Sequence, residues 1–219
     1  MRGKMRSIYW NAKKKKEVEE IKHEPAEQVV LMSGPGDMGS STGVESDENK
    51  IYFYSQVGDR EVLELNRAIK RLDKEMQMVG ITFNIPPPPI ELHIQSEGGS
   101  AFAGIAAYDC IRACKTPVHT YIDGCAASAA TLLFLAGKKR VLYRNSFMLI
   151  HQVSASVMGG KYEEFKDELK NQEKLMHTIK KIYLETGKLS EEELTELMKH
   201  DLWLDSETIL QNGFADELI

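Results

Sequence analysis

Short apolar runs of strand length alternate with segments of helical periodicity from Lys50 to the end of the chain. The runs Ile51–Tyr54, Ile90–Gln95 and Pro117–Ile122 are rich in β-branched and aromatic residues, which favour strands. The segment after the first run carries apolar residues at the three- and four-residue spacing of a helix that buries one face: Val62, Leu65, Ile69, Leu72 and Met76. Because parallel strands need crossover helices of this kind, the alternation predicts an α/β fold with mainly parallel strands.

Turn and capping residues predict where these elements begin and end. We expect Asp59 to cap the first helix, and the prolines Pro86–Pro89 to end that unit because proline lacks a backbone N–H and breaks a helix. A second helix is expected over about residues 101–113. The Asp123-Gly124 pair is a turn signal, so the third strand is expected to end there and to be followed by an Ala-rich helix over about residues 127–135.

The C-terminal part of the chain continues the same alternation. Two short strands are expected at Val141–Tyr143 and Phe147–Ile150. A long, heavily charged amphipathic segment predicts a helix over about residues 161–185. Ser190 is followed by acidic residues, the pattern of a helix N-cap with a favourably charged first turn. Residues 50–219 are therefore expected to form one domain.

Residues 1–49 differ in composition from that domain and are expected to form a weakly ordered leader. The first 16 residues carry seven Lys or Arg and no acid, and a Gly-, Ser- and Pro-rich stretch follows at 32–43. A secretory signal needs an apolar stretch after its basic start, and none follows here. We therefore favour a solvated basic arm, with an electrostatic tether to nucleic acid or to an acidic partner as the alternative.

The overall composition excludes several classes of protein. With 42% hydrophobic and 28% charged residues, the chain is typical of a soluble globular protein. Its net charge of −5 gives no indication that nucleic-acid binding is its main role. The longest apolar run, about residues 126–136, is far shorter than the roughly 20 residues that span a membrane. No membrane association is therefore expected.

The cysteines suggest a reducing compartment and no metal. Three cysteines, Cys110, Cys114 and Cys125, are too few and odd in number for a disulfide framework, which favours a cytoplasmic location. Cys110 and Cys114 are one helical turn apart with His119 nearby, but a fourth ligand at suitable spacing is missing. We expect buried thiols here and neither a metal site nor a cofactor.

Three local features could take part in catalysis. Ser128 lies among alanines at a predicted helix start, where free N–H groups favour a developing anion. The Gly98-Gly99 pair at a strand end allows the backbone to approach a ligand closely. His151 follows the apolar run 147–150, so its imidazole is expected at a strand end. Taken singly, each has a structural explanation: a helix cap, a tight turn and a hydrogen-bonded histidine.

Four segments together resemble the ClpP peptidases. SEGGSAFAGIAAYD (96–109) is similar to that family's SPGG-x-x-x-AG-x-x-x-YD stretch, and GCAASAATLLFLAG (124–137) to its nucleophile segment G-x-AAS-x-x-x-x-LL-x-AG. NSFMLIHQ (145–152) resembles the NS-x-x-MIHQ histidine segment. DLWLDSETILQNGFADELI (201–219) resembles the C-terminal segment that begins with the family's aspartate. The resemblance implies repeated ββα units of the ClpP/crotonase kind with an extended handle helix at about 161–185.

The resemblance also implies roles for individual residues. Ser128 would be the nucleophile, His151 the general base and Asp201 the carboxylate that orients the histidine. The backbone N–H groups of Gly99 and Ala129 would form the oxyanion hole, and Gly98, Gly99 and Ser100 would bind substrate. The choice of Asp201 comes from the resemblance alone, because residue patterns leave Asp205 and Asp167 equally open.

The implied assembly is a barrel of two stacked heptamers that encloses the catalytic sites. An AAA+ unfoldase would feed unfolded protein substrates into it, so ATP would belong to the partner and the peptidase itself would need no cofactor. The chain departs from the family at Glu97, where the motif has proline, and after Gln152, where the usual proline is absent. The region that meets the unfoldase is not recognisable in residues 1–49.

Three alternatives remain open from the sequence. A non-catalytic ring subunit would share the fold, but such relatives usually lose triad residues. A crotonase-like enzyme would use Gly-rich loops to stabilise an enolate formed from an acyl-CoA thioester. A Ser-Lys peptidase would use a lysine instead of His151 as the base.

Overall fold

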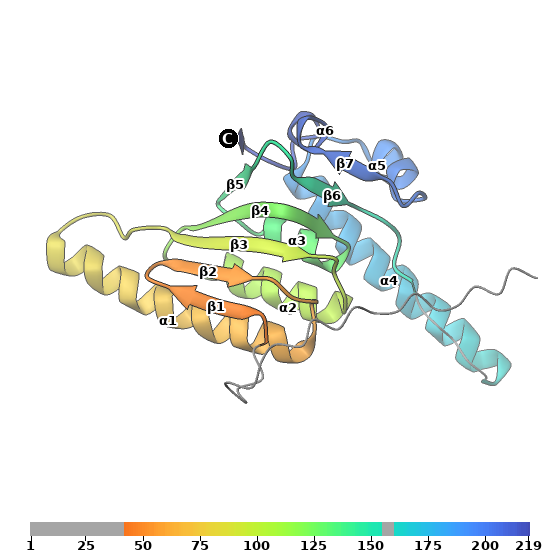
Figure 1. Cartoon of the computed structure of the whole chain (residues 1–219). Coiled ribbons are helices and arrows are strands. Elements are labelled where there is room, and N and C mark those ends of the chain that lie inside the picture. The colour runs from red at the N-terminus through yellow and green to blue at the C-terminus, as the bar shows by residue number, and fades with distance from the viewer. Residues whose placement is uncertain (1–41, 155–159) are drawn as a thin grey trace, which may run out of the picture. The chain divides into compact units, whose positions relative to one another are not determined.

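The computed structural model describes residues 42–154 and 160–219. Strands and helices follow one another along the chain as the sequence predicts, and Figure 1 shows their arrangement. The elements, in chain order, are β1 (Val44–Asp47), β2 (Lys50–Phe53), α1 (Asp59–Phe83), β3 (Ile90–Ser96), α2 (Ala101–Arg112), β4 (Val118–Ala127), α3 (Ala129–Leu135), β5 (Lys139–Leu142), β6 (Phe147–Leu149), α4 (Tyr162–Thr186), α5 (Glu191–Leu197), β7 (Trp203–Asp205), α6 (Ser206–Gln211) and β8 (Glu217–Leu218).

One mixed sheet organises the domain, with strand order β1-β2-β3-β4-β5-β8. The pairs β2–β3, β3–β4, β4–β5 and β5–β8 are parallel, while β1 is antiparallel to β2. Beyond its pairing with β5, β4 also pairs in parallel with β6, and β7 is antiparallel to β6. The α/β class with mainly parallel strands is therefore confirmed.

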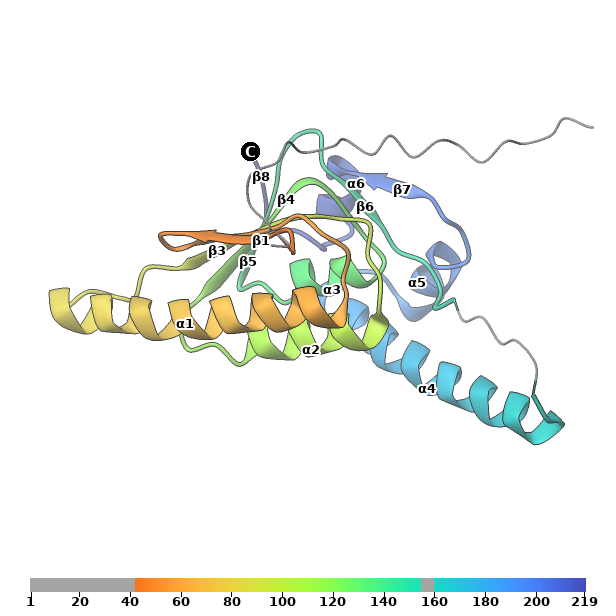
Figure 2. The same ribbon diagram turned by 60° about the horizontal axis from the view of Figure 1, so that its bottom comes forward.

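Helices α1, α2 and α3 cover one face of this sheet, as the two views in Figures 1 and 2 show. The predicted apolar stripe of α1 packs onto the sheet, where Leu65 and Ile69 are fully buried against Leu92 and Ile94 of β3. All seven residues of α3 are buried. The core therefore lies directly beneath the C-terminal ends of β3 and β4, where it supports the loops that follow them.

Two predicted element boundaries were wrong. Asp123-Gly124 does not turn the chain, because β4 continues to Ala127 by pairing with Ser96 of β3 and with all of β6. These pairs come from distant parts of the sequence and override the local turn signal. Asp59 is the first residue of α1 and Gly58 is its N-cap, so the Asp59 carboxylate contributes through the helix dipole.

Other elements agree closely with the sequence or were not predicted. The long charged helix spans Tyr162–Thr186, and Ser190 caps α5 with a capping box to Glu193. Strand β1 lies inside the range 1–49 assigned to the leader, so the sheet begins before Lys50. Strands β7 and β8 and helix α6 were not predicted. Residues 1–41 of the predicted leader lie outside the described residues.

Candidate active site

Ser128 occupies the junction between β4 and α3 in a conformation that is rare for a residue with a side chain. It is the N-cap of α3, with φ 53° and ψ −126°. Its N–H donates to the carbonyl of Leu149 at 2.9 Å, and its own carbonyl accepts from the Thr131 hydroxyl at 2.6 Å. Such positive-φ conformations persist only when surrounding contacts hold them, and they cluster at functional sites.

The loop after β3 packs directly against Ser128. Gly98 has φ 100°, and a Cβ added there would lie 2.6 Å from the Ala127 carbonyl oxygen and 2.7 Å from the Ser128 Cβ. The loop is fastened to Val57, whose N–H donates to the Gly98 carbonyl and whose carbonyl accepts from the Ser100 N–H, both at 2.8 Å. Only glycine fits this approach, which explains the paired glycines that the sequence displays.

The two N–H groups predicted to form an oxyanion hole are on adjoining segments. A Cβ on Gly98 would be 3.2 Å from the Ala129 nitrogen, so the glycine loop and the start of α3 are in contact. Within residues 42–154 and 160–219, neither the Gly99 N–H nor the Ala129 N–H donates a hydrogen bond. Both donors therefore remain available to a ligand beside Ser128.

Strand register brings the histidine and the aspartate together. Ala127 of β4 pairs with Leu149 of β6, which places His151 just beyond the same strand ends as Ser128. Leu149 also pairs with Trp203 of the antiparallel strand β7. His151 lies two residues after Leu149, and Asp201 lies two residues before Trp203. In an antiparallel pair, the same register therefore brings His151 and Asp201 opposite each other. Ser128, His151 and Asp201, although Ser128 and Asp201 are 73 positions apart in the sequence, thus lie near the same strand ends.

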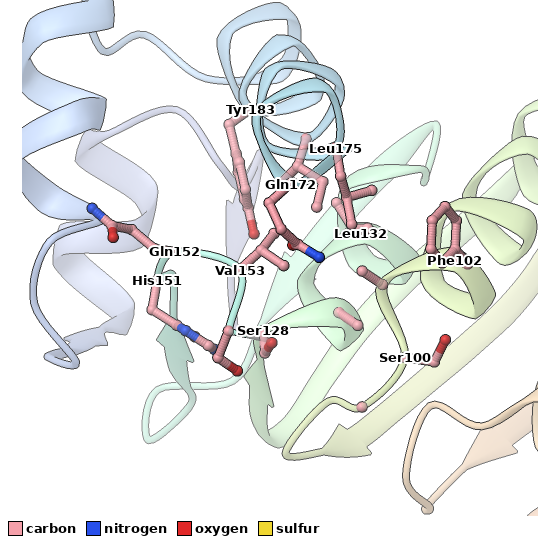
Figure 3. Close-up of a pocket in the computed structure, with 15 residues that line it drawn as sticks. Ser100, Phe102, Ser128, Leu132, His151, Gln152, Val153, Gln172, Leu175 and Tyr183 are labelled. Atoms are coloured by element: carbon pink, nitrogen blue, oxygen red, sulfur yellow. The ribbon is translucent and has the colours of Figure 1, made fainter. Parts of the chain in front are cut away.

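The distances in this group are longer than those of hydrogen bonds. His151 Nδ1 lies 3.9 Å from Asp201 Oδ1, and the side chains are 25% and 82% exposed, respectively. Within the described part of the chain, Ser128 and His151 form no hydrogen bond with each other, although both line the same pocket (Figure 3). Catalytic hydrogen bonds are often long without substrate and shorten in the substrate complex.

The other two aspartates left open by the sequence have different partners. The Asp205 carboxylate caps α6 by accepting from the Thr208 N–H at 2.8 Å, and interactions with the Thr208 side chain and N–H lower its pKa. Asp167 pairs with Lys170 one turn along α4. The geometry therefore distinguishes Asp201 from both, because it is the one of the three that lies beside His151.

A pocket of about 250 Å³ opens beside Ser128 and His151. Its walls come from the start of α2, from α3 and from the inner face of α4, and Figure 3 shows their side chains. Large apolar side chains of the lining come from these helices and from the segment after β6: Phe102, Leu132, Val153, Leu175, Ile179 and Tyr183. An apolar pocket next to a serine is suited to holding one side chain of a bound peptide.

Helix α4 is connected to Ser128 by a pair of hydroxyl groups that sequence reasoning missed. The Tyr183 hydroxyl contacts the Thr131 hydroxyl, which in turn donates to the Ser128 carbonyl. Burial raises the pKa of Tyr183 to about 12, so it stays protonated and can donate to Thr131. The position of Thr131, three residues after Ser128, was a signal in the sequence, but the contact with α4 was not.

The residues considered for a metal do not form a site. Among residues 42–154 and 160–219, no group of three or more His, Cys, Asp or Glu side chains is arranged to hold a metal ion. Cys110 lies on α2 and Cys114 just after its end, where burial raises the pKa of Cys114 to about 12, and His119 is on β4. In this same part of the chain, no helix combines the length and apolar character needed to cross a membrane.

Comparisons with known proteins support the resemblance. The family model described as Clp protease matches residues 46–219. An ATP-dependent Clp protease proteolytic subunit from Deinococcus radiodurans is 35% identical over 136 residues, which cover 61% of this chain and 66% of that protein. Subunit 2 of the same kind from Treponema pallidum is 35% identical over 133 residues, with 60% and 66% covered. The matched segment thus spans just under two thirds of each relative.

A solved structure supports the fold independently. A ClpP1 mutant from Listeria monocytogenes superposes on this chain with a TM-score of 0.65 and 23% sequence identity. The superposition covers 76% of this chain and 88% of the other. At this identity the comparison establishes the shared fold of repeated strand and helix units.

Proposed function

Since this chain belongs to the Clp protease family, we propose that it is a serine endopeptidase that hydrolyses unfolded polypeptides. In this proposal Ser128 is the nucleophile, His151 the general base and Asp201 the carboxylate that orients His151. The observation that carries it is the strained Ser128 at the end of β4, beside the N–H groups of Gly99 in the glycine loop and of Ala129 in α3, neither of which donates to a residue within 42–154 or 160–219. This arrangement suits attack on a carbonyl carbon.

The chemistry follows from the positions of these groups. The Ser128 Oγ attacks the peptide carbonyl while His151 accepts its proton, and Asp201 stabilises the imidazolium that forms. The negative charge on the carbonyl oxygen is stabilised by the N–H groups of Gly99 and Ala129, each worth about 3–4 kcal/mol in such sites. His151 then protonates the leaving amine, and water hydrolyses the acyl-enzyme. Gly98 to Ser100 would align the substrate backbone.

The reaction is proposed to occur inside a barrel of two stacked heptamers. Helix α4 supports this because it projects away from the sheet in both views (Figures 1 and 2). Its first two turns expose large apolar side chains at Tyr162, Phe165 and Leu169. An exposed apolar helix face is typical of a surface that a partner chain covers. Delivery of substrates by an AAA+ unfoldase is part of the same proposal.

The alternatives have less support at this site. A crotonase-like enzyme would need the glycine loop, but its chemistry would not require His151 and Asp201 to lie side by side. A Ser-Lys peptidase would need a lysine beside Ser128, and among residues 42–154 and 160–219 no lysine lines the pocket. A non-catalytic ring subunit would not require the strained backbone of Ser128.

Active-site labelling tests the proposed chemistry. A fluorophosphonate probe should modify Ser128 of the full-length protein, as located by mass spectrometry, and Ser128→Ala should abolish both labelling and hydrolysis of short fluorogenic peptides. Ser154→Ala, which changes another serine of the same pocket, is the matched control and should still label. A folded, oligomeric protein that neither labels nor cleaves peptides would show that the proposal is wrong.

A further inference from the structure

One polar atom in the pocket beside Ser128 has no partner. Gln172 lies on α4 and lines this pocket, and Figure 3 shows its side chain extending from the helix toward it. Its Nε2 donates to the Glu168 carboxylate at 2.6 Å. Its Oε1 is buried and accepts no hydrogen bond from residues 42–154 or 160–219.

The orientation of this amide is set by chemistry. An ionised carboxylate only accepts hydrogen bonds, so the nitrogen of the Gln172 amide must face Glu168. The oxygen is then left without a donor among residues 42–154 and 160–219, in a side chain that lines the pocket. Glu168 and Gln172 are four residues apart on one helix, so the fold of α4 alone maintains this contact.

No residue within 42–154 or 160–219 donates a hydrogen bond to this acceptor. The neighbouring wall is apolar, with Leu132, Leu175 and Ile179 contributing no donor. The Tyr183 hydroxyl is already engaged with Thr131. A buried acceptor without a partner destabilises the free protein, and a ligand that supplies a donor relieves that cost.

We propose that Gln172 makes this pocket prefer a side chain with an apolar body and a terminal N–H or O–H group. The preferred side chain belongs to the substrate residue whose carbonyl Ser128 attacks, so the inference rests on the proposed peptidase function. Tyr and Gln have this character, whereas Phe and Met have similar shapes without the donor. A pocket with a hydrogen-bonding group rejects the analogue that lacks the partner, because its own polar atom stays buried and unpaired.

Matched peptides test this preference in the full-length protein. Fluorogenic substrates that differ only at the cleaved residue would be compared in two pairs, Tyr against Phe and Gln against Met, by kcat/KM. In at least one pair we expect the donor-bearing peptide to have a kcat/KM about tenfold higher than its partner. Gln172→Met keeps the length of the side chain without its acceptor, and this variant should bring that ratio close to one.

Controls separate the preference from general effects. Gln77→Met removes a half-buried glutamine of α1, far along the chain from this pocket, and should leave the ratio as in the unaltered protein. Gln172→Leu serves as a second variant if Gln172→Met does not fold. The ratio in the unaltered protein is informative by itself. If the two peptides of each pair have nearly equal kcat/KM, the inference is overturned without any variant.

The outcomes also distinguish this inference from the proposed function. Labelling of Ser128 and peptide hydrolysis, with ratios near one or ratios that Gln172→Met leaves unchanged, would overturn the role of Gln172 and leave the peptidase proposal standing. A protein that neither labels nor hydrolyses would overturn both. A tenfold preference that disappears in Gln172→Met but persists in Gln77→Met would support both.

Discussion

At the scale of single residues, Ser128 has a backbone conformation that costs about 1–3 kcal/mol elsewhere in proteins. Hydrogen bonds to Leu149 and Thr131 hold it, and the absence of a side chain at Gly98 makes room for it. His151 and Asp201 are not held so tightly, since 3.9 Å separates them and Asp201 is largely exposed. The backbone of Ser128 is therefore held tightly, whereas the His151 and Asp201 side chains lie beyond hydrogen-bond distance of each other.

The exposure of Asp201 limits how much it contributes to catalysis. Loss of the buried aspartate of a triad reduces kcat by about 10⁴. An aspartate that is 82% exposed stabilises the imidazolium less, because water screens its charge. We therefore expect Asp201→Asn to reduce kcat by about 10², measured with a short fluorogenic peptide.

Asp205→Asn is the matched control for this prediction. Asparagine also caps helices, so α6 should remain intact and kcat should be unchanged. Equal losses in the two variants, or a loss in Asp205→Asn alone, would contradict the assignment of Asp201.

At the scale of secondary-structure elements, hydrogen bonds link parts of the chain that packing alone would leave independent. Tyr183 connects α4 to Thr131 of α3, and through it to the carbonyl of Ser128. Arg140 of β5 makes a two-pronged ion pair with Asp216 just before β8 and also donates to the Thr186 carbonyl at the end of α4. Hydrogen bonds therefore connect α4 both to Ser128 and, through Arg140, to the segment just before β8.

Removing the Tyr183 hydroxyl tests the link between α4 and Ser128. Tyr183→Phe should lower the free energy of unfolding by about 1 kcal/mol, the usual value of one hydrogen bond. It should also lower kcat several-fold with little change in KM, because Thr131 loses the partner that orients it. Chemical denaturation and peptide kinetics would measure the two effects.

Tyr162→Phe, at an exposed position on the same helix, is the control and should change neither the free energy of unfolding nor kcat. An unchanged kcat in Tyr183→Phe would contradict the link.

The Arg140–Asp216 pair predicts a pH-dependent contribution to stability. In the folded state, the hydrogen bonds that Arg140 donates to the Asp216 carboxylate lower the pKa of Asp216. A carboxyl whose folded pKa is lowered stabilises the fold above its unfolded pKa of about 3.9, and this contribution is lost as pH falls through the folded pKa. Asp216→Asn should therefore cost about 1 kcal/mol or less at pH 7, since the carboxylate is 40% exposed.

Urea denaturation near neutral pH and at progressively lower pH would measure this contribution. The difference in free energy of unfolding between the unaltered protein and Asp216→Asn should shrink as the unaltered protein becomes protonated at Asp216. Asp47→Asn, at an exposed site on β1, should show no such trend. A deficit that stays constant down to acidic pH would contradict an electrostatic origin.

At the scale of the whole molecule, the described domain consists of a sheet covered by three helices, from which α4 projects (Figure 2). The inner part of α4 is buried at Ile179, Ile182 and Tyr183, where it forms one wall of the pocket. Its outer part is exposed and carries apolar side chains. The same helix thus shapes the pocket at one end and offers an interaction surface at the other.

Polar substitutions on the outer part of α4 test the proposed assembly. Phe165→Ser combined with Leu169→Ser should reduce the native mass from that of an oligomer to that of smaller species, because apolar surface drives most subunit association. Lys174→Ser, at an exposed polar position of α4, is the control and should keep the native mass. Native mass spectrometry makes the comparison. A large oligomer that survives the double substitution would show that α4 does not hold it together.

The sequence by itself determined most of the elements and the candidate nucleophile and base. Apolar spacing predicted α1 because buried residues recur with the helical period. The helix buries four of the five predicted residues, and Met76 is partly buried against the core. Paired glycines and a serine among alanines marked the places where the backbone approaches closely. These signals are local, since each depends on residues that are neighbours in the chain.

Only the tertiary structure decided the features that depend on contacts between distant segments. The continuation of β4 past Gly124 depends on pairing with β3 and β6, and the position of Asp201 depends on the register of β7 with β6. The contact of Tyr183 with Thr131 and the unpaired oxygen of Gln172 arise where α4 crosses the pocket. No pattern in the sequence specifies such contacts, because strand register and helix docking are set by the packing of the whole domain.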